Sequence, residues 1–255
     1  MIHAIHDLRP DVVAISGDLT QRARAREFIE ARELLIALPQ PQIVVPGNHD
    51  IPSYNLFARF RRALDMYREY ISEDLEPFYS DDEIAVVGLN TARSLVIKNG
   101  RINQEQIHKV EERLCTLGKR VVKVVVTHHP FDLPDSFAGR ALVGRAEKAM
   151  ERFARCGVDL LLAGHWHQTS CGPTAARYGS GHHAAIFVQA GTACSTRRRG
   201  EPNSFNVIRA DHTHIEVQSW SSHAGDRFHP QASQYFRRSA DGWVPHDAPK
   251  HHAIH

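Results

Sequence analysis

Four apolar segments of this sequence all end in the same way, in a short cluster of glycine and polar residues. The clusters that follow them are Gly17-Asp18, Gly47-Asn48-His49-Asp50, His128-His129-Pro130 and Gly164-His165-Trp166-His167. Apolar runs of about four to eight residues between such clusters are typical of buried strands. Because the segments between them are long enough for helices, we expect an α/β fold, in which ligands bind at the carboxyl ends of the strands.

Five segments are predicted to be helical, at residues 1–8, 25–38, 53–72, 103–117 and 143–156. Pro10 and Pro39 end the first two, since proline disfavours the helical conformation in the residue before it. The fourth has the clearest start, because Asn103 can cap its first turn and Gln106, three residues on, can bond back as in a capping box. Strands and helices therefore alternate up to residue 167.

The pattern changes beyond residue 167. Short apolar runs at 186–188, 205–208 and 215–217 are separated by turn residues, which predicts a mostly antiparallel second sheet. Asp241-Gly242 is a hairpin signal close to the end of the chain. We expect one domain over residues 1–220, followed by a hairpin and a polar tail over residues 221–255.

Charge and cysteine content exclude several classes of protein. The 31 basic and 29 acidic residues nearly balance, so no overall field attracts nucleic acid or an anionic membrane. No apolar run approaches the roughly 20 residues that span a bilayer, and no leader opens the chain. Cys115, Cys156, Cys171 and Cys194 lie far apart, which predicts reduced thiols. We therefore expect a cytoplasmic protein that acts neither on nucleic acid nor at a membrane.

The clusters combine the three ligand types that divalent transition metals prefer: carboxylate, amide oxygen and imidazole. The candidate ligands are Asp18, Asn48, His128, His165 and His167. This mixture suits Mn, Fe, Zn or Ni better than Ca²⁺, and the lack of thiolates argues against a structural zinc site. On an extended backbone, His165 and His167 would point the same way and Trp166 the opposite way.

With these motifs in this order, each after a strand, the sequence resembles the calcineurin-like metallophosphoesterases. It is most similar to the branch that includes class III cyclic-nucleotide phosphodiesterases and glycerophosphodiesterases, and the resemblance extends to about residue 220. It implies a four-layer α/β/β/α sandwich of two mixed sheets flanked by helices. It also implies a dinuclear site in which Asp18 bridges two divalent ions, His167 binds the first, and Asn48, His128 and His165 bind the second.

The resemblance further implies a reaction. A metal-bound hydroxide would attack a phosphodiester of the cyclic-nucleotide or glycerophosphodiester type, because metal binding lowers the pKa of water to about 7. His49 would stabilise the transition state or protonate the leaving group, and Asp50 would orient His49. Phosphoryl transfer depends mainly on charge neutralisation and positioning, which agrees with these roles.

One part of the family pattern is absent. The family opens with a strand that carries Asp-x-His and supplies two ligands to the first metal, whereas no such motif precedes Asp18. His3, His6 and Asp7 lie on the predicted first helix instead. The hypothesis at this stage is an N-terminally shortened enzyme that lacks the first strand, which the nucleotide sequence upstream of Met1 would test.

Several alternatives stay open. The chain is either an enzyme with a small phosphodiester substrate or a non-catalytic scaffold or binding protein with the same fold, and a nuclease or phosphomonoesterase would differ only in substrate. The late strands are candidates for a homodimer surface. His129 is interpreted as a neighbour that shapes its loop. The residues 90–93 and 197–199 are interpreted as turns rather than substrate contacts.

Overall fold

A six-stranded mixed sheet forms the centre of the computed structural model, which describes residues 1–52, 62–94, 99–137, 139–178, 183–194, 202–223 and 227–248. Its strands, in the order in which they lie side by side, are β3 (Phe78–Ser80), β4 (Ile84–Gly88), β5 (Val122–Val126), β6 (Leu160–Ala163), β8 (Ile186–Gln189) and β7 (Ser170–Pro173). The four inner strands are parallel, and the two edge strands are antiparallel to their neighbours. The polar clusters that follow β5 and β6 therefore lie side by side at the carboxyl ends of these parallel strands.

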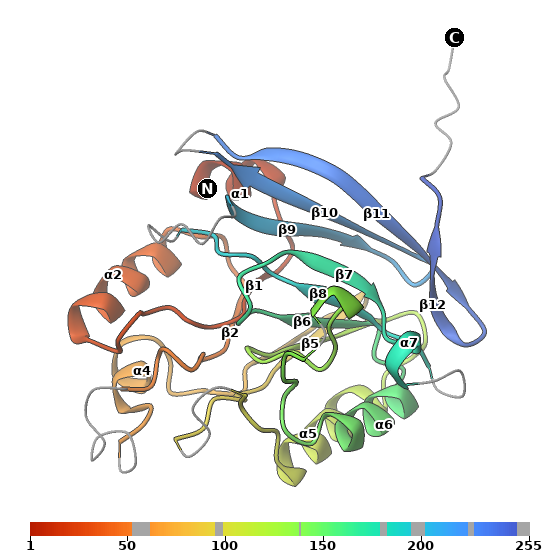
Figure 1. Ribbon diagram of the computed structural model, residues 1–255, viewed down its shortest axis with the longest axis horizontal. Coiled ribbons are helices and arrows are strands. Elements are labelled where there is room, and N and C mark those ends of the chain that lie inside the picture. The colour runs from red at the N-terminus through yellow and green to blue at the C-terminus, as the bar shows by residue number, and fades with distance from the viewer. Residues whose placement is uncertain are drawn as a thin grey trace.

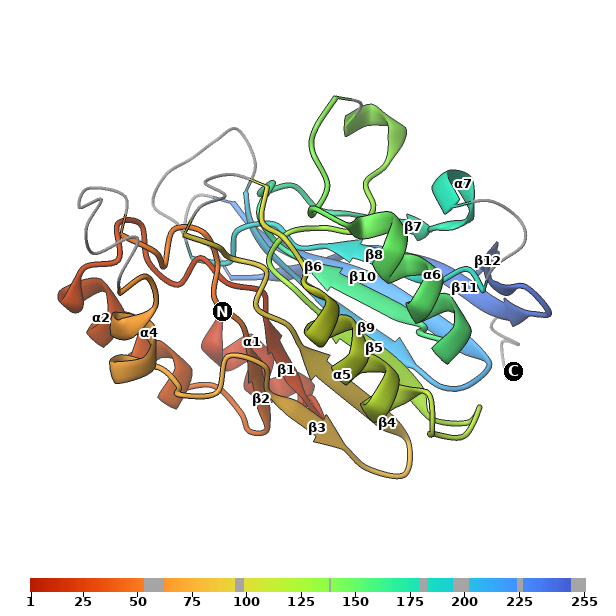
Figure 2. The same cartoon turned by 90° about the horizontal axis from the view of Figure 1, so that it is seen from below.

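Helices α5 (Gln104–Leu114) and α6 (Ala146–Cys156) cover one face of this sheet (Figure 2). Their apolar side chains, such as Ile107 and Phe153, pack with Val87 and Val125 in one core. The predicted capping box at the start of α5 is confirmed, with the Gln106 amide donating to Asn103 at 2.8 Å.

The other face packs against a four-stranded antiparallel sheet (Figure 1). Its strands are β9 (Asn203–Ala210), β10 (His214–Ser222), β11 (His229–Ser239) and β12 (Gly242–His246). Val124 and Ile186 meet Ile215 and Trp243 in the core between the two sheets. The predicted hairpin at Asp241 is present, and its strand β12 pairs with β11. Residue 220, the proposed domain boundary, lies inside β10.

The amino-terminal part adds a parallel pair of strands and its helices. Strand β1 (Val13–Ile15) pairs with β2 (Gln42–Val44), and Ile43 and Val45 belong to the core between the sheets. The helices here are α1 (Ile2–Leu8), α2 (Ala25–Ile36) and α4 (Asp65–Tyr70). Two short helical turns, η1 (Asp135–Phe137) and α7 (Ala175–Tyr178), lie in later loops.

The predicted α/β sandwich is confirmed, with some differences in detail. The second sheet is wholly antiparallel rather than mixed, and β1 with β2 forms a separate pair. The edge strands β3 and β7 were not predicted. A helix was predicted at residues 53–72. The structure has helix α4 in the second part of this range, and residues 53–61 lie outside the described ranges. No helix within those ranges has the length and apolar composition needed to cross a bilayer.

The prediction of four reduced thiols is wrong for two cysteines. Cys115, just after α5, forms a disulfide with Cys156, the last residue of α6. The buried Lys123 ammonium donates to the Leu117 and Cys156 carbonyls at 3.0 and 2.8 Å. Both interactions join the carboxyl ends of the same two helices. A pairing between cysteines 41 residues apart depends on the packing of α5 on α6, which the sequence spacing does not show.

Asp159 connects the two sheets at the amino end of β6. Its carboxylate accepts hydrogen bonds from Arg238 and Trp243 of the four-stranded sheet, each at 2.8 Å, and from the Lys123 amide at 2.9 Å. Burial alone would raise its pKa, but the nearby His183 ring, the hydrogen bonds from Lys123 and Trp243 and the charge of Arg238 lower the pKa below the ordinary aspartate value. The charged carboxylate therefore stabilises the contact between the sheets.

We expect Asp159→Asn to lower the free energy of unfolding by about 3 kcal/mol, because the change leaves the largely covered Arg238 cation without its counter-charge. Urea unfolding followed by circular dichroism would measure the loss. The matched control is Asp241→Asn, an exposed aspartate in the hairpin turn, which should change stability by less than about 0.5 kcal/mol. Equal effects of the two changes would contradict the assigned role of Asp159.

The contribution of Asp159 should also depend on pH. Because its pKa is lower in the folded than in the unfolded chain, its stabilisation is complete above the unfolded value and is lost as pH falls through the folded value. The difference in unfolding free energy between the unmodified chain and Asp159→Asn should therefore be constant from neutral pH down to about pH 5 and shrink below about pH 4. A difference that stayed constant at pH 3.5 would contradict the lowered pKa.

Candidate metal centre

The polar clusters after β1, β2, β5 and β6 meet at one place, as the sequence predicts. Strands β1 and β2 are held in register past their ends, with the Val45 amide donating to the Ile15 carbonyl at 3.1 Å. Directly beyond them, Gly17 and Asp18 have φ of 86° and 57°, so the chain turns sharply and Asp18 lies against the loop after β2. The His49 amide donates to Asp18 Oδ1 at 3.0 Å.

Asp50 fixes the two amino-terminal loops to each other. Its fully buried carboxylate accepts the Gly47 and Thr20 amides, each at 2.8 Å, and the Leu19 amide at 3.3 Å. Burial and the charge of Asp18 raise the pKa of this carboxyl to about 6. The His49 Nδ1–H donates to the Gln21 carbonyl at 3.0 Å, and Thr20 Oγ1 lies within hydrogen-bond distance of both the His49 carbonyl and the Asp50 carboxylate. The role predicted for Asp50 in orienting His49 stays a prediction. Asp50 positions the loop that carries Asn48 and His49.

Four predicted ligand atoms converge at the centre. Asn48 Oδ1 lies 2.9 Å from His128 Nε2 and 3.0 Å from His165 Nδ1, and these two ring nitrogens are 3.2 Å apart. Asp18 Oδ1 lies 3.3 Å from His128 Nε2. Ligand atoms about 2.0 to 2.2 Å from one tetrahedral ion are separated by a little over 3 Å, so this spacing suits a single divalent ion.

The protonation of the two histidines also suits a metal ion. His128 Nδ1 lies 2.7 Å from the Ser16 carbonyl, which can only accept, so Nδ1 carries the proton and Nε2 keeps its lone pair. Burial and the charge of His128 lower the pKa of His165 to about 3, so this ring is neutral at physiological pH. Metal ligands must be deprotonated, and the neutral His165 ring meets that requirement.

Two glycines make room for this arrangement. A Cβ atom at Gly47 would overlap the Asp18 carboxylate, and one at Gly17 would come within 2.9 Å of His128 Nδ1 and 2.6 Å of the Gly47 amide nitrogen. Only residues without a side chain let the loops approach so closely. The donor set and the space around it therefore fit a bound divalent ion.

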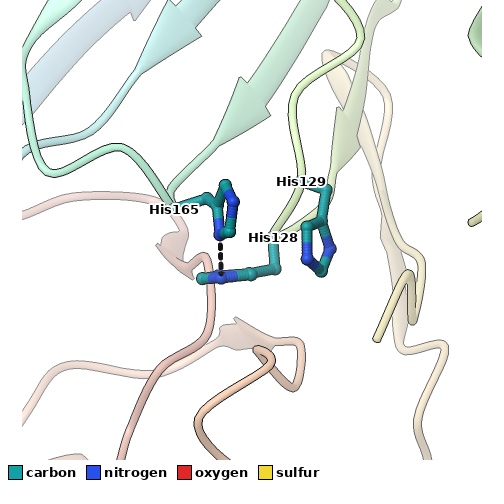
Figure 3. A group of neighbouring side chains, drawn as sticks. All are labelled: His128, His129 and His165. Carbon is teal, nitrogen blue, oxygen red and sulfur yellow. Dashed lines mark hydrogen bonds between the residues drawn. The ribbon is translucent and has the colours of Figure 1, made fainter. Parts of the chain in front are cut away.

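His129 also lies at this centre, although the sequence analysis interpreted it only as a neighbour. Figure 3 shows its ring beside those of His128 and His165, and one nitrogen from each of the three rings lies within 4.8 Å of the others. Its Nδ1 lies 2.9 Å from Thr91 Oγ1, so the loop after β4 holds the ring in place. Alternating side chains on an extended strand predict opposite directions for His128 and His129, but the chain turns just after β5, where Thr127 Oγ1 donates to the His129 carbonyl at 2.9 Å.

The predicted extended geometry of the last cluster is wrong. His165 and His167 have φ of 78° and 60°, and the Trp166 amide donates to the Gly164 carbonyl at 3.0 Å, which closes a three-residue turn. His167 Nδ1 pairs with Thr192 Oγ1 at 2.9 Å, beside rather than within the group of Asp18, Asn48, His128 and His165. Its charge still acts on the pKa of His165, which places it close to the centre.

The loop after β4 is held mainly by its own hydrogen bonds. The Arg93 guanidinium donates to the Asn90 and Ala92 carbonyls and to Gln106, so its hydrogen bonds serve the turn itself. Residues 197–199, also interpreted as a turn, lie outside the described ranges.

Comparison with known proteins gives the family. A model of the calcineurin-like phosphoesterases matches residues 1–169, so the chain belongs to the calcineurin-like phosphoesterase family, as its motifs predict. Purple acid phosphatase PPD1 from yellow lupin (Lupinus luteus) has a similar fold, with a TM-score of 0.62 at 14% identity over 91% of this chain and 47% of that chain.

Two curated relatives agree with the predicted branch. The glycerophosphodiester phosphodiesterase GpdQ of Enterobacter lignolyticus is 30% identical over 126 residues, which are 49% of this chain and 44% of that protein. The probable glycerophosphodiester phosphodiesterase GpdQ of Arcobacter nitrofigilis is 26% identical over 174 residues, 64% of this chain and 58% of that protein. The chain thus spans about half the length of the curated relatives it matches.

We expect His128→Ala to weaken Mn²⁺ binding by more than about 100-fold, because changes to residues that only support a ligand already cost about 10- to 100-fold. Isothermal titration of the chelator-treated chain would measure the affinity. His108→Ala, an exposed histidine on α5, should bind Mn²⁺ as the unmodified chain does. Equal affinities of all three chains would show that the converging atoms are not a metal site.

Proposed function

We propose that this protein is a metal-dependent phosphodiesterase that uses two divalent ions, chosen from Mn, Fe, Zn or Ni. The observation that carries the proposal is the convergence of Asp18, Asn48, His128 and His165 from four strand ends, with carboxylate, amide and imidazole acceptors about 3 Å apart. Acceptors repel one another at that distance unless a cation lies between them. The chain is proposed to hold one ion with these residues, and Asp18 and His167 to contribute to the second.

A bound divalent ion supplies Lewis acidity, which lowers the pKa of water and offsets charge on the phosphate oxygens. The protein contributes the positions of the ligands, because Asp50 ties the loops that carry Asp18 and Asn48, and Ser16 fixes the tautomer of His128. Prearranged charges of this kind supply most of the barrier reduction in phosphoryl transfer.

His49 is proposed as the residue that protonates the leaving oxygen. Its Nδ1–H donates to the Gln21 carbonyl, so Nε2 is the nitrogen that exchanges a proton. The ring is half-buried, and its charge acts on the pKa of His165, so it lies close enough to the centre to interact with a bound phosphate. General acid catalysis of this kind contributes about 10²- to 10⁴-fold to rate.

A phosphodiester is the proposed substrate, of the glycerophosphodiester or cyclic-nucleotide type. The names of the two curated relatives support the former. A leaving group that needs a proton also suits an alkyl ester, because an alkoxide is a poor leaving group without one.

The test compares the unmodified chain, His49→Ala and Asp18→Ala after equilibration with Mn²⁺, with metal content by elemental analysis and hydrolysis of an alkyl phosphodiester, glyceryl ethyl phosphate, measured as released alcohol on the same samples. We expect His49→Ala to keep its metal and lose about 10²- to 10⁴-fold in kcat, and Asp18→Ala to lose both. His229→Ala, an exposed histidine on β11, is the control and should match the unmodified chain.

Each possible result has a distinct meaning. Full activity in His49→Ala would refute the role of His49 but keep the metal centre. An unmodified chain that binds Mn²⁺ without hydrolysing phosphodiesters would refute the enzyme and favour a non-catalytic binding protein with the same fold.

A further inference from the structure

Arg140 lies on the long loop between β5 and α6, where two aromatic rings hold its guanidinium. The guanidinium carbon is 4.1 Å from the centre of the Phe137 ring and 4.9 Å from the centre of the Trp166 ring. The Arg140 amide also donates to the Phe137 carbonyl at 3.0 Å, which closes a turn after η1. Figure 2 shows this green loop projecting from the body of the molecule. The side chain is thus exposed but fixed in place by cation–π contacts.

Trp166 connects this arginine to the metal centre. Its ring lies 4.7 Å from that of His165, nearly edge-on at 71°. The strained turn at His165 and His167 holds the indole, with the Trp166 amide donating to the Gly164 carbonyl. One indole ring therefore separates the Arg140 guanidinium from a proposed metal ligand, which places the cation at the rim of the centre.

The side-chain N–H groups of Arg140 have no hydrogen-bond acceptor among the described residues. Two arginines of nearby elements have acidic partners: Arg177 pairs with Asp132 at 2.5 Å, and Arg152 pairs with Glu111 at 2.9 Å. Arg140 makes no side-chain hydrogen bond or ion pair with any other residue in the described ranges. The guanidinium carbon lies over both rings, and its N–H groups have no acceptor among the described residues, so they stay available to a planar oxyanion.

We propose that Arg140 binds an anionic group of the substrate beyond the phosphate held at the metal centre. This inference rests on the proposed phosphodiesterase function and adds a determinant of specificity to it. The intervening indole keeps Arg140 from the reacting phosphate, so its ligand is a second oxyanion, a carboxylate or phosphate, on the substrate's other ester group. A guanidinium fixed by two rings loses little side-chain entropy on binding, which favours such recognition.

The test uses 4-nitrophenyl phosphodiesters whose second ester group is an alkyl chain of two to four carbons, ending either in a methyl group or in a carboxylate. The measured quantity is the ratio of kcat/KM for the carboxylate ester to kcat/KM for its methyl counterpart. We expect Arg140→Gln to lower this ratio roughly tenfold for the best-fitting chain length, mainly through KM, since hydrogen bonds to charged groups contribute about that much.

Two further variants separate the role of Arg140 from general effects of charge. Arg120→Gln removes an exposed arginine just before β5, at the opposite edge of the sheet, and should leave the ratio unchanged. Phe137→Leu removes one of the two stacking rings and should lower the ratio less than Arg140→Gln does. Arg140→Lys keeps the charge without the planar fork and should restore only part of the ratio.

The outcomes distinguish this inference from the proposed function. Hydrolysis of both ester series with the same ratio in the unmodified chain and Arg140→Gln would overturn the role of Arg140 and leave the phosphodiesterase standing. An equal drop in Arg120→Gln would also overturn it, since overall charge would then explain the preference. No hydrolysis of either series by the Mn²⁺-loaded unmodified chain would refute the proposed function itself.

Discussion

In the proposed metal centre, the fold holds electron-rich acceptor atoms close together although they repel one another. Asp18, Asn48 and His128 present acceptors to one another at about 3 Å. Asp18 also accepts the His49 amide. The Ser16 carbonyl accepts a hydrogen bond from His128 Nδ1–H, and the buried Asp50 carboxylate accepts hydrogen bonds from the amides of both amino-terminal loops. The fold thus holds the acceptor atoms in place before a metal ion binds, and a bound cation would remove the repulsion between them.

The interactions that stabilise the fold lie away from this centre. Asp159 precedes β6 and joins the two sheets, whereas His165 follows the same strand and belongs to the metal centre. One strand therefore connects a structural ion pair at its amino end to a functional site at its carboxyl end. The disulfide between Cys115 and Cys156 likewise lies at the helix ends on the outer face of the six-stranded sheet. Changes at these positions affect stability without changing the ligand set.

The sequence predicts the parts of this protein that follow from local periodicity. The inner strands, helix α5 and the residues at the strand ends were predictable because an apolar run that stops at Gly17 or Gly164 has one direction in which to present its polar groups. Strands β3 and β7 escaped prediction, since edge strands are short and carry little apolar pattern. The disulfide and the place of His129 depend on how helices and loops pack, and the φ of His165 reverses the direction that an extended chain would give its side chain.

The strand ends and the loop between β5 and α6 have different roles in the proposed choice of substrate. The residues proposed to position the reacting phosphate lie at the ends of four strands, which the sheets hold in place. The loop between β5 and α6 projects from the body of the molecule, and loops on a rigid scaffold commonly determine specificity. Trp166 belongs to both parts, since it lies in the turn that places His165 and also stacks on Arg140. On the proposals above, a substrate group that binds Arg140 is linked through one indole ring to His165, so a change at Trp166 would act on both substrate binding and the metal centre.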